Sequence, residues 1–143
     1  MQPILEMTVT RAWHWGIAVV VGDPRGEIPT DLGTEAVAAG RGAVVLSVRH
    51  AQDVEAQAAD GDPAWATATV QVRVLAEMES IGREVLCDVV VDTPERTVAL
   101  GDADGDVVVP APGPRTRVVV SVEQVDPAGV DRAWIDLVVV DRS

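Results

Sequence analysis

Residues 66–77 read ATATVQVRVLAE, and this stretch decides the fold class. Small apolar residues alternate in it with polar ones, which is a period of two along the chain. Successive side chains of an extended strand leave opposite faces, so this period predicts a strand with one buried face. The expected buried face holds Ala68, Val70, Val72 and Val74, and the opposite face holds Thr69, Gln71 and Arg73.

The same alternation recurs in three more valine-rich stretches, EVLCDVVVD (84–92), TRVVVSVEQV (116–125) and AWIDLVVVD (133–141). Short apolar runs bounded by Gly, Pro or Asp predict further strands at 5–10, 17–21, 43–49, 97–100 and 107–109. About nine short strands with turn signals between them indicate an all-β, single-domain antiparallel β-sandwich over residues 1–143, or else an open barrel. Helix is expected only in two short pieces, 53–59 and 31–39.

Composition limits the classes of partner. The chain of 143 residues carries a formal net charge of −12. Binding to a nucleic-acid backbone needs clustered Lys or Arg, and an anionic membrane surface also attracts basic segments, so neither partner is expected. A basic protein partner fits the charge, and so does plain solubility.

The cellular setting is expected to be the cytoplasm of a bacterium with a GC-rich genome. Lys, Asn, Phe and Tyr are all absent, and their codons are AT-rich. The N-terminal residues lack the basic and long apolar regions of a signal peptide, and no apolar run reaches the roughly 20 residues of a membrane span. Cys87 is the lone cysteine, so the chain has no internal disulfide.

The segment DADGD (102–106) resembles the start of a calcium loop, because Asp102, Asp104 and Asp106 take alternate positions. A calcium loop of the helix–loop–helix type needs glycine at position 6 and glutamate at position 12. Those positions hold Val107 and Gly113. Since Asp-Gly between two apolar runs favours a hairpin turn, we predict a hairpin tip and no metal site.

Other candidate chemistry is sparse, so we expect no catalytic residue and no cofactor. His14 and His50 stand in no ligand-spaced motif, and Cys87 falls on an apolar strand face where burial makes a thiol inert. The serines show no nucleophile turn, and the glycines lack the spacing of a phosphate-binding loop. The only aromatic residues are four tryptophans, and core packing is their expected role unless one is exposed as a contact: Trp13, Trp15, Trp65 and Trp134.

The second half of the chain resembles the competence-protein-J (nuclease-inhibitor-like) family of β-sandwich proteins. The resemblance lies in the order of four pieces, namely ATATVQVRV, the hairpin TVALGDADGDVVVP, the strand PGPRTRVVVSV and the closing strand AWIDLVVV. The chain departs from the pattern at Thr116, where an aromatic residue is usual, and it has no Trp-Pro after its last strand. The resemblance implies a small non-catalytic protein that binds and neutralises another protein, such as a nuclease.

Acidic loops are the expected contact surface for that partner, because a nuclease presents a basic cleft. One alternative is an enzyme or small-ligand binder with a pocket between the sheets, using His14, His50 or Arg49. Another is a domain with no activity that the sequence can assign, and the oligomeric state stays open. The residues expected to contact a protein are Asp23, Glu27, Asp31, Asp60, Asp62, Asp102, Asp104, Asp106 and Trp134.

Overall fold

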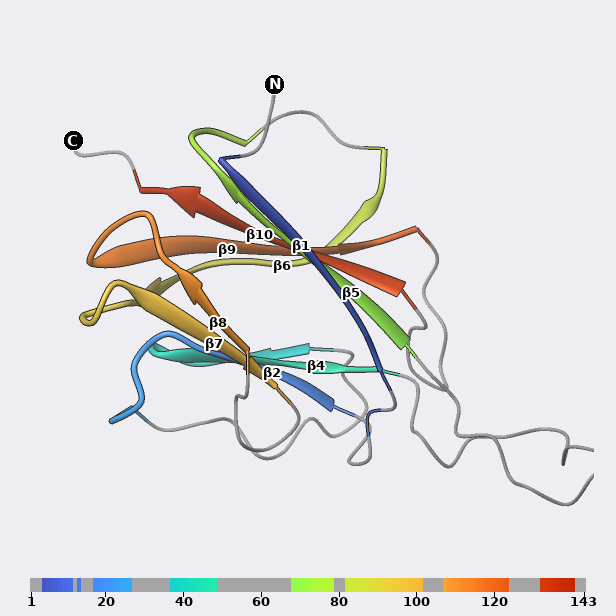
Figure 1. Ribbon diagram of the computed structural model, residues 1–143. Coiled ribbons are helices and arrows are strands. Elements are labelled where there is room, and N and C mark those ends of the chain that lie inside the picture. Colours follow the sequence, from blue (N-terminus) through green and yellow to red (C-terminus); the bar gives the residue numbers. More distant parts are fainter. Residues whose placement is uncertain are drawn as a thin grey trace, which may run out of the picture.

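Two five-stranded β-sheets pack face to face in the computed structural model (Figure 1). The structure describes residues 4–11, 13, 17–26, 37–48, 68–78, 82–101, 107–123 and 132–140. No helix occurs in these ranges, and so none there could cross a membrane. The strands are β1 (Leu5–Arg11), β2 (Ile17–Val21), β3 (Val37–Ala39), β4 (Ala43–Ser47), β5 (Ala68–Leu75), β6 (Glu84–Asp92), β7 (Thr97–Gly101), β8 (Val107–Pro110), β9 (Arg115–Val122) and β10 (Arg132–Val139).

The first sheet has the order β1-β5-β10-β9-β6, and the second has the order β3-β4-β2-β7-β8. All pairs are antiparallel except β5 and β10, which run parallel. The predicted all-β sandwich is therefore confirmed, with one parallel pair that the sequence did not indicate. Strand direction depends on which strands become neighbours, and β5 and β10 are more than fifty residues apart.

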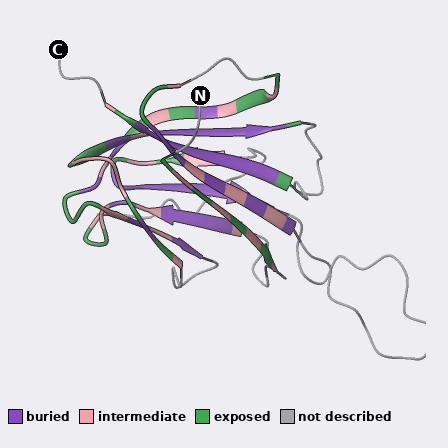
Figure 2. Ribbon diagram, turned by 45° about the horizontal axis from the view of Figure 1, so that its top comes forward, coloured by how far each residue is buried: buried purple, intermediate pink, exposed green. Residues whose placement is uncertain are grey.

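The predicted alternation matches the observed burial along most of the strands. It is wrong for Val85, at the bulge of β6, and for Val139, the last residue of β10, which were expected to point inward and are exposed. Figure 2 shows the buried residues running along the strands of both layers. The face of β5 that was expected to be buried packs into the core between the sheets, together with the inner faces of β9 and β10. Trp13 is fully buried there, and its indole Nε1 donates a hydrogen bond of 3.0 Å to the carbonyl oxygen of Ala68. Trp13 thereby fills the core, as expected for a large aromatic residue.

One predicted helix is wrong where it can be examined. The last three residues of the helix predicted at 31–39 form strand β3. This strand pairs with β4 from Val37↔Leu46 to Ala39↔Val44. Alanine and valine are compatible with either structure, and pairing with a buried neighbour decides the outcome. The rest of that prediction, and the whole of 53–59, lies outside the described residues.

The strands of both sheets begin and finish at two opposite ends of the sandwich. At one end, which we call the loop end, strands β1, β4, β7 and β9 finish and the other six begin. The pairs Arg11↔Ala68 and Ile17↔Ser47 mark this end in the first and second sheets, and only residues 12–16 separate Arg11 from Ile17. The opposite end, which we call the turn end, carries short turns such as 22–26, 40–42 and 93–96.

A close approach of backbone holds the turn end together. The amide of Gly22 donates to the carbonyl of Gly42 at 2.7 Å, and the amide of Asp92 donates to the carbonyl of Arg41 at 2.7 Å. Thr93 is fully buried, and its Oγ1 donates to the carbonyl of Gly113 at 2.6 Å. These bonds tie the end of β6 in the first sheet to turns of the second, so the two layers are locked at this end.

Candidate functional site

The loop end is the candidate site, because the acidic segments of the sequence begin or end there. Leu46 pairs with Val37, Gly101 pairs with Val19, and Thr69 pairs with Arg132. The described residues on both sides of segments 49–67, 102–106 and 124–131 therefore lie at the same end of the sandwich (Figure 1). Val37, which follows segment 27–36, lies at this end too. These four segments contain twelve Asp and Glu residues and one Arg.

The charge of the chain divides between the described strands and the rest. The described residues include nine Arg and nine Asp or Glu, so they carry no net formal charge. The whole net charge of −12 belongs to the other residues of the sequence. The described part of the chain is thus a scaffold without net charge.

The predicted contact residues separate into those outside the described ranges and those within them. Glu27, Asp31, Asp60 and Asp62 lie outside the described residues, as do Asp102, Asp104 and Asp106. Strands β7 and β8 pair from Thr97↔Pro110 to Leu100↔Val107, which confirms the hairpin on either side of 102–106. Asp23 and Trp134 are described, and neither is a freely exposed side chain of the loop end.

Asp23 belongs to the turn end and organises a turn. Its Oδ1 accepts a hydrogen bond of 3.0 Å from the amide of Arg25, and its carbonyl accepts one of 3.0 Å from the amide of Gly26. The amide of Asp23 itself donates to Gly42. This carboxylate stabilises an Asx-type turn, which is the common use of aspartate before proline. Asp23 therefore lies at the opposite end of the sandwich from Gly101 and Val107, which flank segment 102–106.

Trp134 lies on the outer face of the first sheet, opposite Ile135 and Leu137, as its place in the alternation predicted. It is only 7% exposed. The guanidinium carbons of Arg83 and Arg132 stand 4.2 Å and 5.1 Å from the ring centroid, which are cation–π distances. Burial makes packing the role that the structure shows for Trp134. A protein contact through it stays a prediction.

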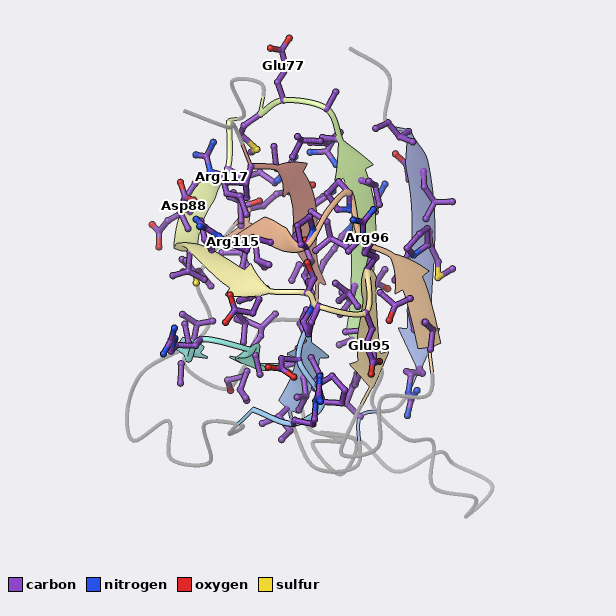
Figure 3. All side chains as sticks on the ribbon, turned by 90° about the vertical axis from the view of Figure 1, so that its left-hand side faces the viewer. Glu77, Asp88, Glu95, Arg96, Arg115 and Arg117 are labelled. Atoms are coloured by element: carbon purple, nitrogen blue, oxygen red, sulfur yellow. The ribbon has the colours of Figure 1, made fainter. Side chains whose placement is uncertain are left out.

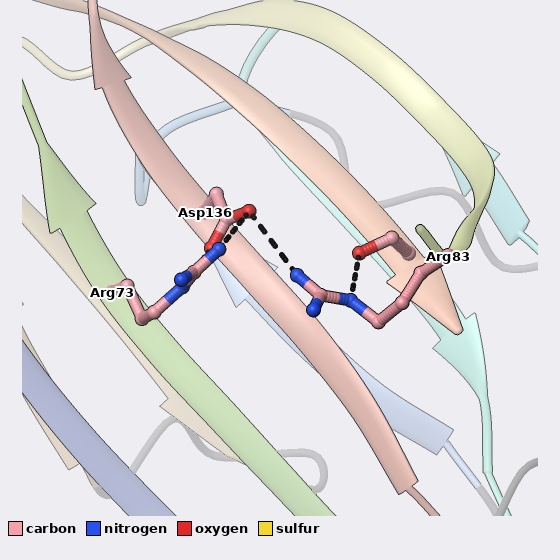
Figure 4. A network of polar contacts seen from close by, with 4 residues as sticks. Arg73, Arg83 and Asp136 are labelled. Carbon is pink, nitrogen blue, oxygen red and sulfur yellow. Dashed lines mark hydrogen bonds and ion pairs between the residues drawn. The ribbon is translucent and has the colours of Figure 1, made fainter. Parts of the chain in front are cut away.

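Next to Trp134 a buried carboxylate lies between two arginines (Figure 4). Asp136 is fully buried, and Arg73 donates to both of its oxygens, through Nε at 2.8 Å and Nη2 at 3.0 Å. Nη2 of Arg83 lies 4.0 Å from Oδ2 of Asp136, and Nε of Arg83 donates to Oγ of Ser121 at 3.1 Å. The alternation placed Asp136 on the outer face correctly, but nothing in the sequence indicated its burial.

The chain that joins β5 to β6 explains this burial. Met78 packs on a small apolar cluster of Leu75, Val119 and Val138 on the outer face of the first sheet. Arg83, just before β6, reaches past Ser121 of β9 towards Asp136 of β10. Met78 and Arg83 of this connection thus lie over the outer face of the first sheet. Asp136, which the alternation had predicted to face solvent, is covered on this face.

A second ion pair of similar geometry is exposed. Arg117 of β9 donates to both oxygens of Asp88 of β6, at 2.8 Å and 2.6 Å, and the two side chains are 39% and 42% exposed. Figure 3 shows these two side chains pointing at each other, on the side of the molecule that also carries Glu77 and Arg115. The hydrogen bond from Arg117 lowers the pKa of the Asp88 carboxyl. The pair is solvated, so its contribution to stability is small.

Cys87 is buried in the core cluster, as its position on the apolar face of β6 predicted. Burial, together with the nearby negative charge of Asp88, raises the pKa of its thiol. Because the thiolate is the reactive form, we expect Cys87 of the native protein to react with Ellman's reagent at pH 8 only as fast as local or global unfolding exposes the thiol. Labelling in denaturant should be complete within minutes. Fast labelling of the native chain would contradict the buried placement.

The enzyme alternative finds no described site. His14, Arg49 and His50 lie outside the described residues. Among the residues that are described, no group of three or more His, Cys, Asp or Glu is placed to hold a metal ion. Ser121 is fully buried with its hydroxyl accepting from Arg83, which makes it part of the packing of the outer face.

The fold is similar to a solved structure whose title reads "Crystal structure of ComJ, inhibitor of the DNA degrading activity of NucA, from Bacillus subtilis". The match covers 97% of this chain and 98% of that one, with a TM-score of 0.59 and 15% sequence identity. No family model and no curated protein sequence matches. The resemblance noted in the second half of the sequence is thus confirmed as a resemblance of fold, and it extends over almost the whole chain.

Proposed function

We propose that this protein is a non-catalytic inhibitor that binds a basic protein partner, with a nuclease as the favoured class of partner. The observation that carries the proposal is the division of charge between a neutral sandwich and acidic segments that adjoin its loop end. The fold shared with an inhibitor of a DNA-degrading enzyme supports the same class of function.

The physical basis is electrostatic complementarity. A nuclease must attract phosphates, so its active cleft carries positive charge. Carboxylates on the segments that adjoin the loop end can enter such a cleft and displace the substrate, while the strands hold the described residues that flank these segments at fixed spacing. Such contacts speed association and weaken as salt increases. The contact residues remain those expected from the sequence at this end, with Asp102, Asp104 and Asp106 foremost because they occupy one hairpin.

The cytoplasm is the proposed place of action, since the chain has a lone, buried cysteine and no disulfide that would require an oxidising compartment. A partner encoded beside this gene is the first to examine, because an inhibitor is usually produced together with its target.

The test measures DNA degradation by NucA, and by any nuclease encoded next to this chain, with increasing amounts of the intact protein. We expect inhibition that weakens between about 50 and 300 mM salt. The triple variant D102N/D104N/D106N should raise the half-inhibitory concentration about tenfold or more, because each lost charge contact slows association or speeds release.

The matched control E77Q/D92N/E95Q also removes three negative charges, but at the turn end. It should change inhibition less than about twofold, since charges remote from the contact act only through a screened field. Equal effects of the two triple variants would contradict a contact at the loop end. If neither nuclease is inhibited and no basic protein is captured at low salt, the proposed function is wrong.

A further inference from the structure

Strand β1 is a long and regular edge strand. It occupies the edge of the first sheet and pairs with β5 over all seven of its residues, from Leu5↔Val74 to Arg11↔Ala68. No described strand pairs with its other side. Its sequence, LEMTVTR, contains no proline, lysine, glycine or bulge within the paired range. An edge strand of this kind is a template for pairing with another chain.

The three other edge strands are protected by features that β1 lacks. Strand β6 has a bulge between Val85 and Cys87, and contacts β3 across the corner of the sandwich. Strand β3 itself has only three residues, and β8 has four and ends at Pro110. Short strands, bulges and prolines are the devices that keep edges from pairing. Among the described edges, β1 is the one open to strand addition.

The side chains of β1 are complementary to a second β1 in antiparallel orientation. A two-fold axis at Thr8 pairs all seven residues of each copy, and any shift of this register leaves some of them unpaired. On the outer face Thr8 then meets Thr8 and Glu6 meets Thr10, so no like charges are opposed. On the inner face Met7 meets Val9, and Leu5 meets Arg11. Thr–Thr and apolar pairs across strands are stabilising.

Such a pair would complete the core along this side of the sandwich. Leu5 and Val9 are only partly buried, although both pack against the core cluster. In such a pair Met7 of the other copy would cover Val9, and the aliphatic part of Arg11 would cover Leu5. Because the strands run antiparallel, Arg11 of one copy lies far from Arg11 of the other, so the two acidic loop ends would point in opposite directions.

We propose that this protein self-associates through antiparallel pairing of β1 with β1 of a second copy, centred on Thr8. The interface is small, so the dimer belongs to the weak class, with a dissociation constant in the range of about 1–100 μM. Sedimentation velocity of the full chain should show the 15.1 kDa monomer at low protein concentration and a dimer at a protein concentration of about 300 μM.

Two lysine variants test the register. In T8K the two lysines face each other across the axis, so the dissociation constant should rise about fivefold or more. In T10K each lysine faces Glu6 of the other copy, so the constant should fall about threefold. Thr8 and Thr10 are both exposed, and each variant changes the net charge by the same amount. Opposite effects of two equal charge changes would identify this register.

A control on the other long edge strand is V90K, at an exposed position of β6. It should leave dimer formation unchanged. The proposal is overturned if the wild-type chain stays monomeric at every concentration. It is also overturned if T8K and T10K shift the equilibrium in the same direction, or if V90K alone weakens the dimer.

Discussion

Replacing Asp136 with alanine is expected to lower the free energy of unfolding by about 3–5 kcal/mol. The carboxylate is fully buried and accepts two hydrogen bonds from Arg73, while Arg83 lies 4.0 Å away. Removing it leaves two guanidinium groups, only 13% and 18% exposed, without their shared counter-charge. A buried charge that loses its partner costs far more than the pair itself contributes. Urea unfolding followed by circular dichroism would measure the loss.

The exposed pair on the same sheet provides a matched control. D88A removes a carboxylate that also accepts two hydrogen bonds from one arginine, but its side chain is 42% exposed. Its cost should stay below about 1 kcal/mol and shrink with added salt. Similar losses for D136A and D88A would show that burial does not set the strength of these pairs.

Acid dependence should separate D88A from the wild type. The pKa of Asp88 is lowered in the folded state, so the stability that it adds is present above the unfolded pKa near 3.9 and is lost as pH falls through the folded value. Unfolding below about pH 4 should therefore depend on pH slightly less in D88A than in the wild type.

Replacing Gly22 with alanine is the second large effect that we expect, a loss of about 3 kcal/mol in the free energy of unfolding. A Cβ at this position would lie 2.6 Å from the carbonyl oxygen of Asp92 and 2.9 Å from Cγ2 of Thr93. The obstructing oxygen belongs to backbone that is itself tied to Arg41 by the amide of Asp92, so it cannot easily move. The midpoint of urea unfolding should fall with little change in slope.

Gly82 is the control for the loss of a glycine. A Cβ there would meet nothing within 4 Å. G82A should change the free energy of unfolding by less than about 0.5 kcal/mol, as expected for an open surface position. A tolerated G22A would mean that the turns of the second sheet and the end of β6 are not held as closely as the structure places them.

How much of this protein could be predicted from its sequence depends on the distance over which each feature is decided. The period of two in residues 66–77 and in the three other valine-rich stretches predicted most of the side chains that enter the core, because alternation is a local property of an extended chain. It was wrong for Val85 and Val139, which are exposed. The hairpin around 102–106 was likewise predicted from the Asp-Gly turn between two apolar runs, and β7 and β8 do pair there.

The candidate site was only half predictable. The acidic residues and their segments are plain in the sequence, but the sequence does not say which segments adjoin the same end of a sandwich. Pairings such as Gly101↔Val19 and Thr69↔Arg132 bring those ends together. Asp23, which the sequence groups with the other acidic loop residues, proves to be part of a turn at the opposite end.

The sequence by itself determined the fold class and most of the inward and outward faces of the strands. Each of these depends on neighbours one or two residues apart. Only the tertiary structure decided that β5 and β10 are parallel neighbours, that Asp136 is buried between Arg73 and Arg83, and that β1 is an edge strand of the first sheet. Those features depend on contacts between residues dozens of positions apart, and local periodicity contains no information about them.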